Sequence, residues 1–233
     1  MLANDRLSAP RRGFIVAVLT LLALPAFLLI KQPAIAQDVG EIGQVTRILG
    51  SATETMNGRT ETLQAGSGVH AGSVIETGAG ARLEIVFIDA SQMTLGENAQ
   101  LTMDEMVYRA GAEQSGSVSQ AFEVFEGTFR YLSGAVARAD LGRVSVTTPV
   151  ATIGIRGTDF FGGPLASGMP PGELHYGFMI LEGAIEVTSV EGSVTLDDPE
   201  EGTFLPMHGQ AAPTPPTRWE QEAIDEAFAS VAF

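Results

Sequence analysis

Residues 146–160 read V-T-T-P-V-A-T-I-G-I-R-G-T-D-F, and they carry more information about the fold than any other part of the chain. Pro149 has no N–H to donate, so it ends strand pairing on one side. Gly154 and Gly157 permit tight backbone geometry where a side chain would clash. We therefore interpret the stretch as a structural element and not as a catalytic one.

Arg156 is the only charged residue between Arg143 and Asp159. A guanidinium group in so apolar a stretch usually holds backbone carbonyls or a carboxylate in place. We therefore expect an ion pair between Arg156 and Asp159, a clamp that fixes the turn. The alternative is that the two side chains together bind a ligand. On the structural interpretation, Arg156→Ala destabilises the whole domain by a few kcal/mol.

Short alternating runs surround this stretch between Gly40 and Gly209. Their apolar members are Leu83, Ile85 and Phe87; Phe122 and Val124; Phe129 and Tyr131; Ile185 and Val187; and Val194 and Leu196. A period of two residues is typical of strands with one buried face. No sustained helical period precedes Pro213. The chain is therefore predicted to be all-β, a single domain of many short strands in a sandwich, barrel or solenoid.

Two further patterns lie inside the β region. Residues 124–129, V-F-E-G-T-F, resemble residues 180–185, I-L-E-G-A-I, which fits stacked hairpins or solenoid turns. Residues 105–120 and 162–172 are rich in Gly, Ser or Pro and are predicted to be long loops. The second loop directly follows the opening stretch, so a mobile flap is an alternative to a plain insertion.

The C-terminal part changes in character. Residues 211–217, A-A-P-T-P-P-T, are predicted to form a stiff, extended linker. Residues 218–233 are predicted to form a short acidic amphipathic helix that packs back on the sheet. The alternative is a helix that docks onto a partner, through Trp219, Ile224 and Phe228.

Residues 1–36 read as an export signal. Its first part carries three positive charges, on Arg6, Arg11 and Arg12. An uncharged apolar run over residues 14–30 follows, and then A-I-A ending at Ala36, a small-x-small cleavage pattern. Cleavage there leaves residues 37–233 in the periplasm or secreted. The twin-arginine route and an uncleaved membrane anchor stay open as alternatives.

Composition limits the possible functions. The chain has a formal net charge of −15, and residues 37–233 alone carry −18. A surface this acidic repels nucleic acid, so nucleic-acid binding is rejected. The chain has no cysteine, which excludes disulfides, thiol catalysis and thiolate metal sites. The core alone must hold the fold.

Three segments, in this order, resemble FecR-type domains, the periplasmic sensing modules of iron-uptake signalling proteins. The first is residues 63–95, with A-G-S-V-I-E-T-G and then F-I-D-A-S. It departs from the family pattern at Ser73, where Asp is common, and at Ala90, where Gly is usual. The second is F-E-G-T-F at residues 125–129. The third is the opening stretch, 146–160, which is the most specific of the three.

The resemblance implies an all-β periplasmic domain over residues 37–210 that binds protein. It implies no enzyme activity, and the residues themselves suggest no cofactor or metal. Partners would be envelope proteins such as an outer-membrane transporter or a sigma regulator. Only 13 residues precede the apolar run, so a stand-alone envelope version of the domain is expected. The resemblance gives structural roles to the signature residues Pro149, Gly154, Arg156, Gly157, Thr158 and Phe160.

The sequence leaves two hypotheses of function. The first is a non-enzymatic interaction module that recognises a partner through a sheet edge, loops or the C-terminal helix. The second is a secreted or periplasmic binder of polysaccharide or a cation. Few aromatic residues are available to stack on sugars, and the three histidines are far apart in sequence. The aromatic residues are Trp219, Tyr108, Tyr131 and Tyr176, and the histidines are His70, His175 and His208. The acidic turn 197–201 is the candidate for cation binding.

Overall fold

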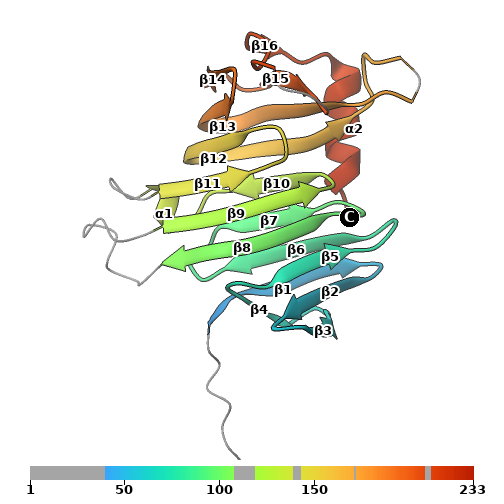
Figure 1. The fold of residues 1–233 in the computed structure, drawn as a ribbon, viewed down its shortest axis with the longest axis vertical. Helices are drawn as coiled ribbons and strands as arrows, with labels where there is room; N and C mark the ends of the chain where they lie inside the picture. The colour runs from blue at the N-terminus through green and yellow to red at the C-terminus, as the bar shows by residue number, and fades with distance from the viewer. Residues whose placement is uncertain (1–39, 108–118, 139–142, 171, 208–210) are drawn as a thin grey trace, which may run out of the picture. The chain divides into compact units, whose positions relative to one another are not determined.

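A computed structural model describes residues 40–107, 119–138, 143–170, 172–207 and 211–233, all within the unit Gln37–Phe233 (Figure 1). In these ranges the chain forms sixteen strands and two helices, which confirms the all-β prediction. Neither helix is long and apolar enough to cross a membrane. The predicted signal, residues 1–36, lies outside the described residues.

Most strands belong to one of two layers. Layer A contains six strands in the order β3-β2-β5-β8-β9-β11. Their bounds are β2 Ala52–Met56, β3 Arg59–Thr62, β5 Val74–Thr77, β8 Gln100–Val107, β9 Ser119–Glu126 and β11 Arg143–Thr147. Layer B contains five strands in the order β10-β7-β6-β1-β4. Their bounds are β1 Glu41–Leu49, β4 Gly68–His70, β6 Arg82–Phe87, β7 Gln92–Leu95 and β10 Phe129–Leu132.

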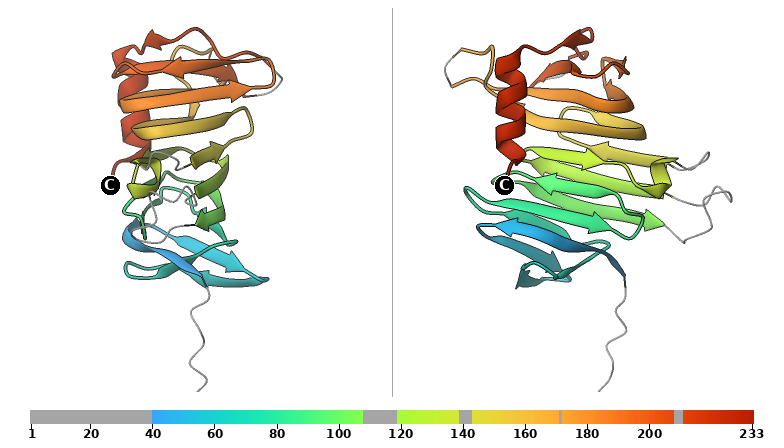
Figure 2. Two further views of the ribbon diagram at one scale, coloured as in Figure 1. Left: turned by 90° about the vertical axis from the view of Figure 1, so that its left-hand side faces the viewer. Right: turned by 180° about the vertical axis from the view of Figure 1, so that it is seen from behind.

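The two layers face each other across one hydrophobic core (Figure 2). Phe122 of layer A lies between Phe87 and Tyr131 of layer B, at ring-centroid distances of 5.1 and 5.8 Å. The inward residues of each strand are buried and the outward residues are more exposed, as on β6 and β9. The period-two pattern of the sequence therefore marks the two inner faces of a sandwich-like sheet.

Two long strands pass from one layer to the other. They are β12, Thr152–Leu165, and β13, His175–Ser189. The first part of β12 pairs with β11 of layer A, and its second part pairs with β10 of layer B. The C-terminal half of β13 pairs with β14, Gly192–Leu196, and its N-terminal half with β15, Glu201–Pro206. One pair of bent strands thus joins the two layers.

The bend lies where the register of β12 and β13 shifts, at residues 156–160. Gly157 has φ +55° and Gly183, opposite it, has φ +86°. A Cβ on Gly183 would lie 2.0 Å from the Gly157 carbonyl oxygen. Both glycines are needed because the backbones touch and turn there at once.

The loop predicted over residues 162–172 is wrong at its start, because β12 continues to Leu165. Gly162 lies inside the strand, and a Cβ there would be 2.5 Å from Phe129 Cζ. The glycine serves close packing against layer B and makes no turn. Strands β8 and β9 take up the ends of the other predicted loop, residues 105–120, whose middle lies outside the described residues.

A buried carboxylate ties the turn between β6 and β7 to its surroundings. Asp89 Oδ1 accepts hydrogen bonds from Ser91 N at 3.0 Å, from Ser91 Oγ at 2.6 Å and from Gln120 Nε2 at 3.0 Å. Its Oδ2 accepts from Val136 N at 3.2 Å, at the start of α1, Ala135–Arg138. The Tyr131 hydroxyl donates to Gln120 Oε1 at 2.8 Å, and burial raises the pKa of Tyr131. The D-A-S motif is therefore the centre of a satisfied polar network.

Ala90 occupies a left-handed backbone conformation in this turn, with φ +63°. An L-residue pays about 1–2 kcal/mol for that conformation, and glycine does not. Glycine loses more chain entropy on folding, which offsets part of the gain. We expect Ala90→Gly to raise the free energy of unfolding by about 0.5–1 kcal/mol. Urea unfolding measures it, and an unchanged or lower midpoint would contradict the expectation.

The C-terminal residues pack on the outer face of layer B. Helix α2 is Gln221–Val231, preceded by the short strand β16, Thr217–Arg218. Its apolar face joins Phe161 and Met179 of β12 and β13 in a second cluster. The proline-rich segment before it is held along β15 by hydrogen bonds of Thr214. Its N–H donates to the Phe204 carbonyl, its hydroxyl accepts from the Phe204 N–H, and its carbonyl accepts from the Thr203 hydroxyl. Figure 2 shows α2 running across the strands of this face.

Candidate functional site

The signature residues lie in three places: the turn before β12, the bend within β12 and the outer face of layer A. Pro149 lies in the turn between β11 and β12, which Thr148 closes through hydrogen bonds with Ala151. Thr158 is buried, and its N–H donates to Ser133 Oγ at 2.8 Å. Phe160 is fully buried in the core. Thr158 and Phe160, together with Gly157, build the bend, whereas Pro149 lies before β12.

The expected Arg156–Asp159 clamp is wrong, because Asp159 pairs with Arg130. Arg130 Nε donates to Asp159 Oδ1 at 2.8 Å, and its NH2 group donates to Oδ2 at 2.6 Å. The hydrogen bond to Asp159 raises the pKa of Arg130. The bend carries Asp159 into layer B beside β10, whereas Arg156 stays on the outer side of layer A, exposed. Truncating Arg156 therefore leaves no buried carboxylate unpaired.

Arg156 and Gly154 instead line a shallow depression of about 610 Å³ on the outer face of layer A. We call this surface the signature face. Its polar and glycine lining comes from four strands: Arg143 and Ser145, Gly154 and Arg156, Glu186, and Thr195.

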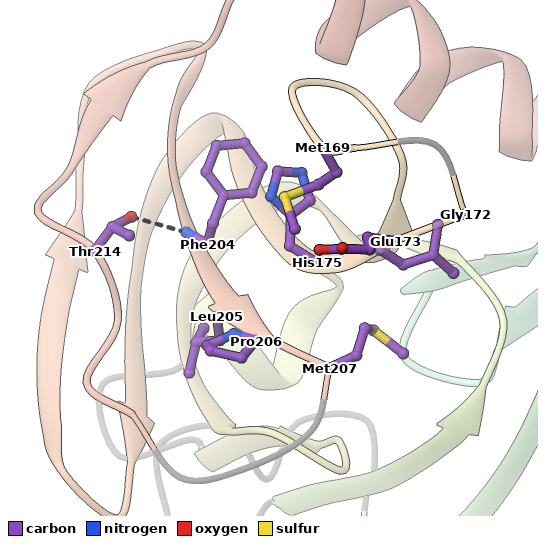
Figure 3. Close-up of a pocket in the computed structure, with 10 residues that line it drawn as sticks. Met169, Gly172, Glu173, His175, Phe204, Leu205, Pro206, Met207 and Thr214 are labelled. Carbon is purple, nitrogen blue, oxygen red and sulfur yellow. Dashed lines mark hydrogen bonds between the residues drawn. The ribbon is translucent and has the colours of Figure 1, made fainter.

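A second depression, of about 600 Å³, lies beside the start of β13 and the end of β15, near α2 (Figure 3). We call it the helix-side pocket. Its lining is mostly apolar and comes from three segments: Met169, Gly172, Glu173, Leu174 and His175; Phe204, Leu205, Pro206 and Met207; and Thr214. Sequence reasoning missed it, because no spacing brings these segments together.

An aromatic stack forms the inner wall of the helix-side pocket. The His175 ring lies 4.1 Å from the Phe204 ring, nearly parallel to it, and Phe204 stacks on Trp219 at 4.8 Å. Burial lowers the pKa of His175, and the nearby Glu226 offsets part of this effect. Among the described residues, neither Nε2 of His175 nor Nε1 of Trp219 has a hydrogen-bond partner, and both atoms are buried. The wall is therefore a neutral, flat surface with two unpaired polar atoms.

Helix α2 also anchors the loop that borders this pocket. The Glu226 carboxylate accepts hydrogen bonds from Ala166 N at 2.8 Å and Ser167 N at 2.9 Å, and also from the Ser167 hydroxyl. Burial alone raises the pKa of Glu226, but these hydrogen bonds outweigh it and hold the pKa below its ordinary value.

The anchor is expected to be pH-dependent. Because the folded-state pKa of Glu226 is lowered, its contribution is complete above the ordinary glutamate pKa of about 4.3 and is lost as the pH falls through the folded value. Proteolysis between residues 166 and 174 should accelerate below about pH 4 in the native protein, and at pH 7 in Glu226→Gln. Glu222→Gln, on the same helix, is the matched control. Equal cleavage of both variants at pH 7 would contradict the expectation.

The predicted docking residues of the C-terminal helix are mostly occupied by the chain itself. Trp219 and Ile224 are buried, with 5% and 7% exposure, in the cluster beneath α2. Phe228 is 38% exposed and lies near Arg130, whose guanidinium carbon is 5.9 Å from the ring centroid. Packing on layer B therefore leaves only Phe228 of the three available to a partner.

The two histidines that the structure describes, His70 and His175, do not converge. His70 lies beside Glu54, with Nδ1 3.1 Å from Oε2, while His175 lines the helix-side pocket and His208 falls outside the described residues. In the described ranges no group of three or more His, Asp or Glu side chains is arranged to hold a metal ion. In the acidic turn, Glu201 Oε2 accepts from the backbone N–H of Asp197 and of Asp198. The Glu201 carboxylate therefore stabilises the backbone of the turn.

The family model described as FecR protein matches residues 73–195, more than half of the 233-residue chain. No curated protein sequence matches the chain.

Solved structures give weaker similarities. Two crystal structures of a protein assigned as an anti-sigma factor from Parabacteroides distasonis ATCC 8503 each give a TM-score of 0.48 at 13% identity. The alignment covers 65% of this chain and 62% of theirs. A cell surface anchoring domain matches at 28% identity with a TM-score of 0.25, over 26% of this chain and 80% of that one. The match of the family model, which spans the layer-crossing strands and their signature, shows that the chain belongs to the FecR family.

Proposed function

We propose that this FecR-family protein is a non-enzymatic sensing module of the cell envelope, which acts by recognising another protein. Family membership supports a regulatory role. The observation that carries the proposal is the helix-side pocket, which is open, mostly apolar and flanked by Met169 and Met207. Flexible methionines adapt to apolar side chains of a partner. Leu174, 46% exposed at its rim, adds to the apolar contact surface.

The alternative of a polysaccharide binder is less well supported. Sugar binding needs exposed aromatic rings, but Trp219, Tyr131 and Tyr176 are all buried. Tyr108 lies outside the described residues. Among the described residues, no arrangement favours sugar or cation binding over protein recognition.

The proposal places the protein in the periplasm or outside the cell, after cleavage of the export signal at Ala36. The intact mass of the protein recovered from its native host should then correspond to residues 37–233. A mass that includes residues 1–36 would identify a membrane-anchored protein instead. Replacing Ala34 and Ala36 by leucine should block cleavage, because the site requires small residues.

Partner recognition is tested by photo-crosslinking in the native host. A photo-reactive residue at position 174, on the rim of the helix-side pocket, is expected to capture an envelope protein such as an outer-membrane transporter or a sigma regulator. The same residue at Thr60, on the exposed edge strand β3, is the matched control. Equal capture from both positions, or none from position 174, would overturn the proposal.

A further inference from the structure

The signature face holds two arginines directly opposite each other. The antiparallel register of β11 and β12 pairs Val144 with Ile155 and thereby places Arg143 opposite Arg156. Both are exposed. Like charges at directly opposed positions destabilise a sheet. Folding therefore gives no reason for this pair.

No described residue neutralises either guanidinium. Among the described residues, neither Arg143 nor Arg156 forms an ion pair, whereas Arg47, Arg59, Arg130 and Arg218 each do. The rest of the protein is strongly acidic, with a formal net charge of −15. The pair is thus a local positive site on a negative molecule, which favours a negatively charged group of another molecule.

The floor beside the pair is open. A Cβ on Gly154 would have no heavy atom within 4 Å. The neighbouring row of the sheet carries Ser145, Gly154, Glu186 and Thr195 across four strands. This row lies two residues from the arginine row, about 7 Å along the strands. The depression therefore offers two cations at one end and hydroxyl groups with one carboxylate at the other.

We propose that the Arg143–Arg156 pair binds the carboxylates of an acidic, extended segment of a partner protein. The inference rests on the proposed function and names the chemistry of the partner. Guanidinium forks bind carboxylates with two parallel hydrogen bonds. Glu186 repels a carboxylate at the second row and accepts hydrogen bonds from donors there, so it fixes the direction in which the segment lies.

The test measures binding of a fluorescent peptide of alternating Ser and Glu to the purified protein at low ionic strength, by anisotropy. Arg143→Gln and Arg156→Gln are each expected to weaken binding roughly tenfold, the effect of one lost charge-assisted contact. Glu186→Gln should tighten binding, because it removes the repulsion. Arg59→Gln, which makes the same charge change on β3, is the matched control and should leave binding unchanged.

The melting temperatures separate recognition from folding. Arg143→Gln and Arg156→Gln should melt no lower than the native protein, because they relieve a like-charge contact. If Arg59→Gln weakened binding equally, net charge alone would drive binding and the proposal would be overturned. Unchanged binding of the peptide to both Arg143→Gln and Arg156→Gln would overturn it as well. Equal competition by free glutamate or inorganic phosphate would show a site for small anions only. Since this test uses no cellular partner, it can fail while the crosslink at position 174 succeeds.

Discussion

Replacing Gly183 by alanine is expected to lower the free energy of unfolding by about 3–5 kcal/mol. The new Cβ would lie 2.0 Å from the Gly157 carbonyl oxygen, and φ at this position is +86°. The backbone would have to move at the point where β12 and β13 pass between the layers, so both layers would be strained. A domain of this size is typically stable by about 5–15 kcal/mol, so the loss is a large share. Urea unfolding measures it.

Two glycine variants separate the causes of this effect. Gly58 has a similar φ of +76°, but a Cβ there would have no heavy atom within 4 Å. Gly58→Ala should therefore lower the free energy of unfolding by only about 1–2 kcal/mol. Gly154→Ala has open space and no positive φ, so it should be neutral or slightly stabilising. If Gly183→Ala cost no more than Gly58→Ala, the close contact at the bend would have no energetic importance.

Asp89→Ala is expected to cost about 3–5 kcal/mol, because it leaves buried donors unpaired. Asp89 is 2% exposed and accepts four hydrogen bonds, from Ser91, Gln120 and Val136. Without its carboxylate, the turn between β6 and β7 loses the hydrogen bonds to Gln120 Nε2 of β9 and to Val136 N of α1, while the Gln120–Ser91 bond and the bond from Ala135 N to the Asp89 carbonyl remain. Chemical denaturation, monitored by far-ultraviolet circular dichroism, measures the change.

Asp89→Asn tests whether the two acceptor oxygens of the carboxylate contribute more to the free energy of unfolding than the volume of the side chain. The amide has nearly the same size, but its NH2 group must face a donor, either Val136 N or the Ser91 and Gln120 groups. We expect a loss of about 1–3 kcal/mol. Asp104→Ala, an exposed change on β8, should stay within about 0.5 kcal/mol. A cost for Asp89→Ala equal to that of Asp104→Ala would contradict the network.

The β architecture and the buried faces were predictable, because alternation along a strand is local information. The E-G pairs at residues 126–127 and 182–183 were also informative. Gly127 has φ +78° and Gly183 has φ +86°, so the echo between the two segments marks the same backbone requirement. The unusual Ala90 follows the same logic, since it occupies a left-handed position where the resembling family usually has glycine.

The partner of Asp159 was not predictable, because sequence proximity favoured Arg156 over Arg130. Arg130 is 29 residues away and reaches Asp159 only because β10 pairs with β12 after the bend. Hydrophobic pattern does not reveal a bend within a strand. The helix-side pocket was missed for the same reason, since its walls come from segments joined only by tertiary packing.

The sharing of β12 and β13 between the layers has a consequence for the order of assembly. Layer A and layer B each depend on this hairpin, whose second strand ends only at Ser189. Strands made early lie toward the two ends of the hydrogen-bonded path, which are β3 and β4, and gain their final support late. Pairing across long sequence separations slows folding. We therefore expect slow refolding whose rate is set mainly by the β12–β13 hairpin, so that mutations at the bend slow folding more than they speed unfolding.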